Sequence, residues 1–265
     1  MRSIAVHGLG LWFNGASDWA TGREILLGKR ALDLGLGHPK APAIVPPNER
    51  RRITPTVALA LHVAWQAVEH SGFDAGKLPS VFVSSEGDAG IVDRICDTLA
   101  VDAFALSPTL FHNSVHNAAA GYWSIAVGSM EASTTLSAHD GSVAAGLLEA
   151  ATQVCVAEKS LLLVFYDVPP PPPLLAKRPL TGAFGAALVL SPANWPGTLG
   201  ILELDVCETR EEGGMDSRFL EALRIGNPAA RSLPILAALA GSVNRDLTLP
   251  FDHGCSLQIK VAPCV

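Results

Sequence analysis

Short apolar stretches of strand length alternate with helical segments along the whole chain, and this alternation limits the folds open to it. The expected strands cover 3–10, 80–88, 133–137, 160–168, 182–193, 199–209 and 253–261. The expected helices cover 17–32, 54–74, 90–100, 111–128, 143–157 and 231–246. Strands and helices in this order predict a layered α/β fold in which helices pack on mixed sheets.

The composition of the chain argues against two classes of protein. Of the 265 residues, 49% are hydrophobic and 17% are charged, yet no apolar run reaches the ~18 residues of a membrane span. The net charge of −6 argues against nucleic acid as the main partner. The surplus of apolar residues instead predicts a large core or an obligate interface with a partner protein.

The cysteines and the first residues of the chain indicate its compartment. The cysteines form no CxxC pair and no zinc spacing, which is typical of reduced thiols, and they lie at Cys96, Cys155, Cys207, Cys255 and Cys264. The opening "MRSIAVHGLGLWF" lacks the sustained apolar region and the cleavage site of a secretion signal. We therefore expect a cytoplasmic protein.

Two motifs that could bind a cofactor or a metal give only weak signals. "GLGLWF" lacks the third glycine of a dinucleotide loop, because Phe13 stands there, so a tight turn after strand 3–10 explains it better. His112 and His116 could share one helical face, but neither is followed by the glutamate of a zincin. "HNSVHN" instead resembles the polar start of a helix that packs at an interface. No cofactor and no metal are expected.

The segment "STTLSAHDGSVAAGLLEA" (133–150) predicts a strand that turns abruptly into a helix. Many α/β enzymes place a nucleophile on such a turn, where it is exposed and faces the positive end of the helix. This chain has Asp140 there, next to His139. Asp140 could be a catalytic acid, the relic of a lost nucleophile, or a cap for the helix that starts at Gly141. We favour the cap, which predicts that asparagine replaces Asp140 at little cost. The adjacent side chains should point in different directions.

A run of prolines at 169–173 follows the strand expected at 160–168. Proline lacks the N–H group that helix and sheet interiors need, so this run cannot lie inside either element. A polyproline loop is the favoured interpretation, and a ligand for a proline-binding domain is the alternative.

Several segments, taken in order, resemble parts of the β-ketoacyl synthases of the thiolase-like superfamily. They are "IAVHGLGLWFNGASDWATGREILLGKRAL", "SPTLFHNSVHNAAAGYWSIAVG", "GAFGAALVLSPA", "LPILAALAGSVNRDLTLP" and "HGCSLQIKV". They cover the synthases' first half nearly throughout and their second half only in fragments. The resemblance implies a thiolase-like layered fold with a complete first half at 1–195 and a truncated second half at 196–265, together forming one compact unit.

The same resemblance places the cysteine nucleophile of the synthases at Asp140. A carboxylate cannot form the usual stable thioester intermediate. The synthases' "HGTGT" histidine motif is absent, and "FDHG" around His253 replaces their glycine-rich signature. The resemblance therefore implies a degenerate site with no catalytic residue, in which Asp140 occupies the nucleophile position and His139 is its neighbour.

Within this superfamily, the chain looks most like the short chain-length-factor-like subunits of aryl polyene systems. That implies a non-catalytic subunit that forms a heterodimer with a full-length β-ketoacyl synthase, meets acyl carrier protein through the complex, and shapes the acyl tunnel in polyketide or fatty-acid-type biosynthesis. The residues implied at the tunnel or interface are Phe111, Val115, His116, Asn117, Trp123, Thr134, Thr135 and Leu136. Val115 takes the gating place among them. Two alternatives stay open: a weak malonyl-thioester decarboxylase that uses Asp140 or His139, and a carrier-protein docking scaffold.

Overall fold

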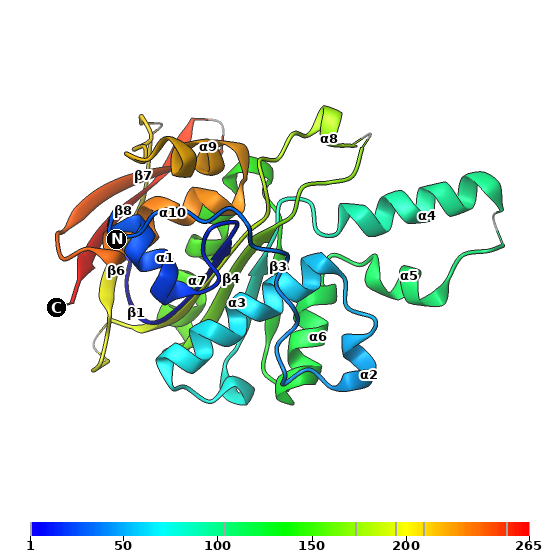
Figure 1. Cartoon of the computed structure of the whole chain (residues 1–265). Coiled ribbons are helices and arrows are strands. Elements are labelled where there is room, and N and C mark those ends of the chain that lie inside the picture. Colours follow the sequence, from blue (N-terminus) through cyan, green and yellow to red (C-terminus); the bar gives the residue numbers. More distant parts are fainter. Residues whose placement is uncertain are drawn as a thin grey trace.

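The computed structural model describes residues 2–102, 104–172, 174–193, 195–208, 210–252 and 254–264. Eight strands in these ranges form one mixed sheet in the order β3-β2-β4-β5-β1-β6-β8-β7 (Figure 1). They are β1 (Arg2–Phe13), β2 (Ser80–Val83), β3 (Ser133–Leu136), β4 (Leu161–Asp167), β5 (Phe184–Pro192), β6 (Gly200–Glu208), β7 (Arg245–Asp252) and β8 (Cys255–Pro263). β2 pairs in parallel with β3 and β4, whereas the other neighbours are antiparallel. The predicted α/β class is confirmed.

Helices cover both faces of the sheet. The α-helices are α1 (Trp19–Leu26), α2 (Pro47–Arg50), α3 (Pro55–Ser71), α4 (Ala89–Val101), α5 (Pro108–Asn113), α6 (Ala118–Val127), α7 (Ser142–Ala157), α8 (Leu174–Lys177), α9 (Arg218–Gly226) and α10 (Leu233–Ala240). Single turns of 3₁₀ helix are η1 (Ala75–Lys77), η2 (His139–Gly141) and η3 (Ala229–Ser232). α3 and α6 pack on one face, and α1, α7, α9 and α10 pack on the other. Within the described ranges, none of these helices combines the length and apolarity needed to cross a bilayer.

The strand β4 shows why the sheet lies between two helical layers. All seven of its residues are buried, and successive side chains alternate between the two sides. Leu163 and Phe165 belong to the cluster around α7, whereas Leu162 and Val164 belong to the cluster around α3. A continuous apolar run is the pattern of a strand covered on both faces.

The prediction of a tight turn after residue 10 is wrong, because β1 continues through both glycines to Phe13. A Cβ atom on Gly10 would lie 2.0 Å from the carbonyl oxygen of Val63 in α3. A Cβ atom on Gly8 would lie at the same distance from the carbonyl oxygen of Ala67. The glycines therefore let α3 pack directly against the backbone of β1, and they do not form a turn.

Three of the expected helices end differently from the prediction. The helix expected at 17–32 already ends at Leu26. The segment 111–128 is broken, because α5 ends at Asn113 and α6 begins only at Ala118. The segment 231–246 is helical up to Ala240, and Arg245 already begins β7. Neither β7 nor α9 was predicted.

The helices α4 and α5 extend away from the body of the molecule (Figure 1). We call residues 88–117 the arm. Six large apolar side chains of the arm are exposed: Val92, Leu99, Val101, Phe104, Phe111 and Val115. Burial of apolar surface drives folding, so such a concentration at the surface indicates contact with another molecule.

Candidate functional site

The sharp turn predicted between strand and helix is present, and it is strained. β3 ends at Leu136, η2 forms the turn, and α7 starts at Ser142. His139 adopts a left-handed conformation with φ of 50°, which is costly for a residue other than glycine. The Ser142 hydroxyl supports the turn by donating to the carbonyl oxygen of His139 at 2.7 Å and accepting from the amide of Ala138 at 3.0 Å. We call residues 138–142 the elbow.

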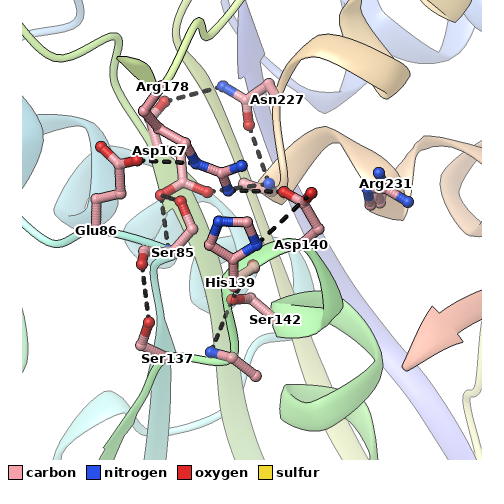
Figure 2. Close-up of polar contacts among 12 residues, drawn as sticks. Ser85, Glu86, Ser137, His139, Asp140, Ser142, Asp167, Arg178, Asn227 and Arg231 are labelled. Carbon is pink, nitrogen blue, oxygen red and sulfur yellow. Dashed lines mark hydrogen bonds and ion pairs between the residues drawn. The ribbon is translucent and has the colours of Figure 1, made fainter. Parts of the chain in front are cut away.

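Asp140 is ion-paired and does not cap α7. Its Oδ1 accepts a hydrogen bond from Nη2 of Arg178 at 2.6 Å, and α7 has no side-chain cap at its N-terminus. The capping prediction is therefore wrong, because Asp140 lies inside the turn before the helix and its carboxylate points toward Arg178 (Figure 2). His139 Nδ1 lies 3.6 Å from the other carboxylate oxygen, so the two adjacent side chains approach each other, contrary to our expectation.

Arg178 joins the elbow to a second carboxylate. Its Nε donates to Oε1 of Glu86 at 2.9 Å, while its Nη2 holds Asp140 (Figure 2). Partial burial alone would raise the pKa of Asp140, but the hydrogen bond and charge of Arg178 outweigh it and hold the pKa below its usual value. Asp140 is therefore a bound anion at neutral pH.

A fully buried carboxylate, Asp167, lies behind this ion-pair cluster at the end of β4. Its Oδ1 accepts from the Ser84 hydroxyl at 2.9 Å and from the backbone N–H and hydroxyl of Ser85 at 2.8 and 3.0 Å. Its Oδ2 accepts from the amide of Ala229 at 3.1 Å. Burial raises the pKa of Asp167 to about 6, although these donors favour the charged form. Asp167 thus ties the ends of β2 and β4 to η3.

The predicted tunnel residues of the arm and of α6 do not all lie at the surface. The side chains of Phe111 and Val115 are 63% and 49% exposed, and Asn117 is exposed beside them. His116 turns inward, with its Nε2 3.2 Å from the carbonyl oxygen of Ser84. Trp123 is only 1% exposed and packs against Trp65, so the indole belongs to the core beside α3.

Thr134, Thr135 and Leu136 lie on β3, which is an edge of the sheet. β3 pairs in parallel with β2, and no strand of the described chain pairs with its other side. All three side chains are half-buried, and Gln153 of α7 donates to the Thr134 hydroxyl at 3.1 Å. The edge therefore presents free backbone N–H and C=O groups to a second chain.

Three residues of the site were not predicted from the sequence: Glu86 and Arg178 of the ion-pair cluster, and the buried Asp167. A signal was present for one of them, because Asp167 ends a strand that is otherwise apolar. An acid at such a place is buried only when hydrogen bonds satisfy it. Nothing in the sequence pairs Arg178 with Asp140, which lies 38 positions earlier.

The histidines considered as metal ligands do not converge. His112 contacts the ring of Tyr122 edge-on, His116 faces Ser84, and His139 lies at the elbow. Among the described residues, no group of three or more His, Cys, Asp or Glu side chains is arranged to hold a metal ion. His253, in the segment "FDHG", lies outside the described residues.

Comparison of the structure with solved structures shows the same fold in proteins of low sequence identity. One match is a chain of "Ketosynthase (ApeO) in Complex with its Chain Length Factor (ApeC) from Xenorhabdus doucetiae", with 22% identity, TM-score 0.70 and coverage of 98% of this chain and 99% of that chain. A chain of "The ishigamide ketosynthase/chain length factor" matches with 14% identity, TM-score 0.73 and coverage of 99% and 100%. A chain of "AntDE:AntF (apo): type II PKS acyl-carrier protein in complex with its ketosynthase bound to the hexaketide" matches with 14% identity, TM-score 0.75 and full coverage of both chains.

Comparison at the sequence level gives the family. The search of curated proteins returned no match. A family model described as "Beta-ketoacyl synthase, N-terminal domain" matches residues 30–216, which is more than half of the chain. The chain therefore has the thiolase-like layered fold that the sequence predicted, and it belongs to the family of the β-ketoacyl synthase N-terminal domain.

Proposed function

We propose that this chain is a non-catalytic, chain-length-factor-like subunit. It forms a heterodimer with a full-length β-ketoacyl synthase and shapes that enzyme's acyl tunnel in aryl polyene or related polyketide and fatty-acid-type biosynthesis. The observation that carries the proposal is the free edge of β3, which lies directly before the elbow. Residues 133–136 can add the corresponding strand of a partner, because the exposed ladder of N–H and C=O groups needs one.

The arm supports the same interface. Phe104 is 98% exposed and Phe111 is 63% exposed. Aromatic side chains of this size dominate the energetics of protein interfaces, and a free chain gains nothing by leaving them in water. A partner seated on the β3 edge and the arm would bury both, together with Val115, which is exposed between α5 and α6.

The ion pair at the elbow favours a non-catalytic role over decarboxylation. A catalytic acid or base needs a pKa near the working pH and a free position from which to transfer a proton. Asp140 has a lowered pKa and is held by Arg178 at 2.6 Å. Its carboxylate is therefore neither protonated nor free at neutral pH, and the partner enzyme has to supply the chemistry.

The similar structures support the choice of partner. Two of the matched chains come from structures whose names combine a ketosynthase with a chain length factor, and the similarity extends over almost the full length of both chains. A third name adds an acyl-carrier protein to the complex. By analogy, carrier protein would reach the present chain through its ketosynthase.

Residues 1–195 and 196–265 would correspond to the complete first half and the truncated second half of a synthase. The strands of both parts belong to one sheet, joined where β1 pairs with β6. We propose that the second part serves mainly to cover α7, whose buried side chains share a cluster with β6, β7 and β8.

The proposal is tested by co-expression with candidate ketosynthases and analysis of the reconstituted products. A heterodimer should elute as one species, and it should form polyketide product from acyl and malonyl carrier protein. Val115→Trp should shift the products toward shorter chains, because the larger side chain fills the tunnel, whereas the first condensation should persist. Val243→Trp, at the exposed turn between α10 and β7, is the control and should change nothing. An unchanged length distribution from an intact Val115→Trp heterodimer would refute the tunnel role.

A further inference from the structure

The polyproline run begins a segment that is fixed at several points. We call residues 168–182, between β4 and β5, the strap. Pro170 is buried near its start, and Leu180 is only 7% exposed near its end. The amide of Thr181 donates to the carbonyl oxygen of Gly226 at 2.7 Å. The Asn227 side chain donates to the carbonyl oxygen of Gly182 at 2.9 Å. These contacts favour a rigid loop over a free proline-rich ligand.

Between these anchors, the strap carries Arg178 to the elbow. About one quarter of the Arg178 side chain is exposed, and its guanidinium bridges Asp140 and Glu86 (Figure 2). A guanidinium is planar and keeps its charge, so it can hold two carboxylates in a fixed relation. Charge-assisted hydrogen bonds of 2.6 and 2.9 Å are among the stronger polar contacts in proteins.

Glu86 lies at the root of the arm, where the chain leaves β2 for α4. The next residue, Gly87, has φ of 66°, and a Cβ atom there would lie 3.1 Å from the ring of His116. The amide of Gly87 donates to the Ser84 hydroxyl at 2.9 Å, and His116 lies against the Ser84 carbonyl oxygen. The end of the arm, at His116, therefore contacts the residues that directly precede the arm, next to Glu86.

We propose that the ion pairs Asp140–Arg178–Glu86 form a positioning device that holds the strap and the root of the arm in one fixed relation to the elbow. The acid at the degenerate nucleophile position then serves partner binding rather than chemistry. Its role in partner binding rests on the function proposed above, whereas the device itself does not. Arg178 is a positioning residue in this scheme, and the device requires a negative charge on both of its ion-pair partners, Asp140 and Glu86.

The capping interpretation and this proposal make opposite predictions for Asp140→Asn. Asparagine caps helices as well as aspartate does, so a cap would lose little. Asparagine is neutral, however, and it would leave Arg178 with one carboxylate in place of two. The device therefore predicts a clear effect of Asp140→Asn, similar to that of Arg178→Met.

The experiment is hydrogen–deuterium exchange measured by mass spectrometry on the chain within its co-expressed complex. Asp140→Asn and Arg178→Met should each speed exchange at least tenfold in 174–182 and 84–88, and the double variant should exchange no faster than either single variant. Lys177→Met is the matched control, because Lys177 adjoins Arg178 but forms no ion pair with any residue that the structure describes. His139→Asn keeps a residue that tolerates the left-handed conformation and tests the imidazole separately.

Exchange that stays as slow as in Lys177→Met, or effects of the two single variants that add, would overturn the device. Affinity for the ketosynthase gives the second measurement, and both single variants should weaken it at least fivefold. Faster exchange without weaker binding would overturn the role in partner binding. If the wild-type chain binds no ketosynthase, the proposed function fails, whereas the exchange measurement on the isolated chain still tests the ion pairs.

Discussion

Removing Phe104 from the arm is the most direct test of the proposed interface. The Phe104 side chain is 98% exposed in the free chain, so Phe104→Ser removes almost no contact that stabilises the fold. The thermal unfolding midpoint of the isolated variant should therefore equal that of the wild type. Any loss of heterodimer can then be attributed to the interface.

The size of the expected loss follows from the exposed area. Full burial of a phenylalanine side chain contributes ~1.5–3 kcal/mol, which corresponds to roughly 10- to 150-fold in Kd. Phe104 has nearly its whole side chain available for burial, whereas Phe111 has 63%. Phe104→Ser should thus weaken the heterodimer by roughly 10- to 150-fold, and Phe111→Ser should have a smaller effect.

Titration of the purified ketosynthase with each variant, by calorimetry or biolayer interferometry, measures the dissociation constants. Val243→Ser is the matched control, because Val243 is 68% exposed but lies outside the arm, between α10 and β7. A Kd for Phe104→Ser within twofold of the wild type would show that the arm does not contact the partner. An equal loss for Val243→Ser would show that the effect is not specific to the arm.

Three further predictions concern stability and association. Burial raises the pKa of Asp167 from 3.8 to about 6, so the native state binds this proton more tightly than the unfolded state. The unfolding free energy of the wild type, relative to Asp167→Asn, should therefore fall by about 3 kcal/mol as the pH rises through this range. Urea unfolding of both proteins at each pH measures this free-energy difference. A stability advantage of the wild type that rises with pH would contradict the prediction. Gly10→Ala should destabilise the chain by at least ~1–3 kcal/mol, because the new methyl group meets the backbone of Val63. Gly121→Ala should stabilise it slightly in the same unfolding assay, because the new Cβ meets nothing within 4 Å beyond its own stretch of α6 and alanine favours the helix. The isolated chain should self-associate through β3 at micromolar concentration in light scattering, and a monodisperse monomer would count against a free edge.

The sequence predicted the elements that depend on neighbouring residues. The strand 160–168 was predictable because a continuous apolar run has one stable place in an α/β layer. The helix beginning at Thr54 was predictable because its cap, its first-turn proline and its final glycine are all local signals, and each occupies the expected position. The elbow followed from the change between β-prone and helix-forming residues, and its position was predicted to within one residue.

The prediction failed where distant residues decide the structure. The capping role assigned to Asp140 ignored Arg178, which lies far along the chain and competes for the same carboxylate. Gly10 was interpreted as a turn residue because glycine is common in turns. Its actual role, a close contact with α3, depends on tertiary packing that the local sequence does not reveal. The helix expected at 111–128 is interrupted between Asn113 and Ala118, and in this interval His116 contacts the carbonyl oxygen of Ser84, directly after β2. In each case the structure contains a contact between residues far apart in the sequence, and local propensity alone does not predict such a contact.

The central position of β1 has a consequence for synthesis of the protein on the ribosome. β1 is made first, yet its neighbours in the sheet are β5 and β6, so its pairing is complete only after residue 204 has emerged. At ~5–20 residues per second, that delay is roughly 10–40 s. The apolar strand is a target for chaperones or for aggregation throughout this time. The contact of Gly8 and Gly10 with α3 joins segments less than 70 residues apart, and it can form long before the sheet does. We therefore expect β1 and α3 to emerge as a paired unit that shields one face of the strand until β5 and β6 arrive.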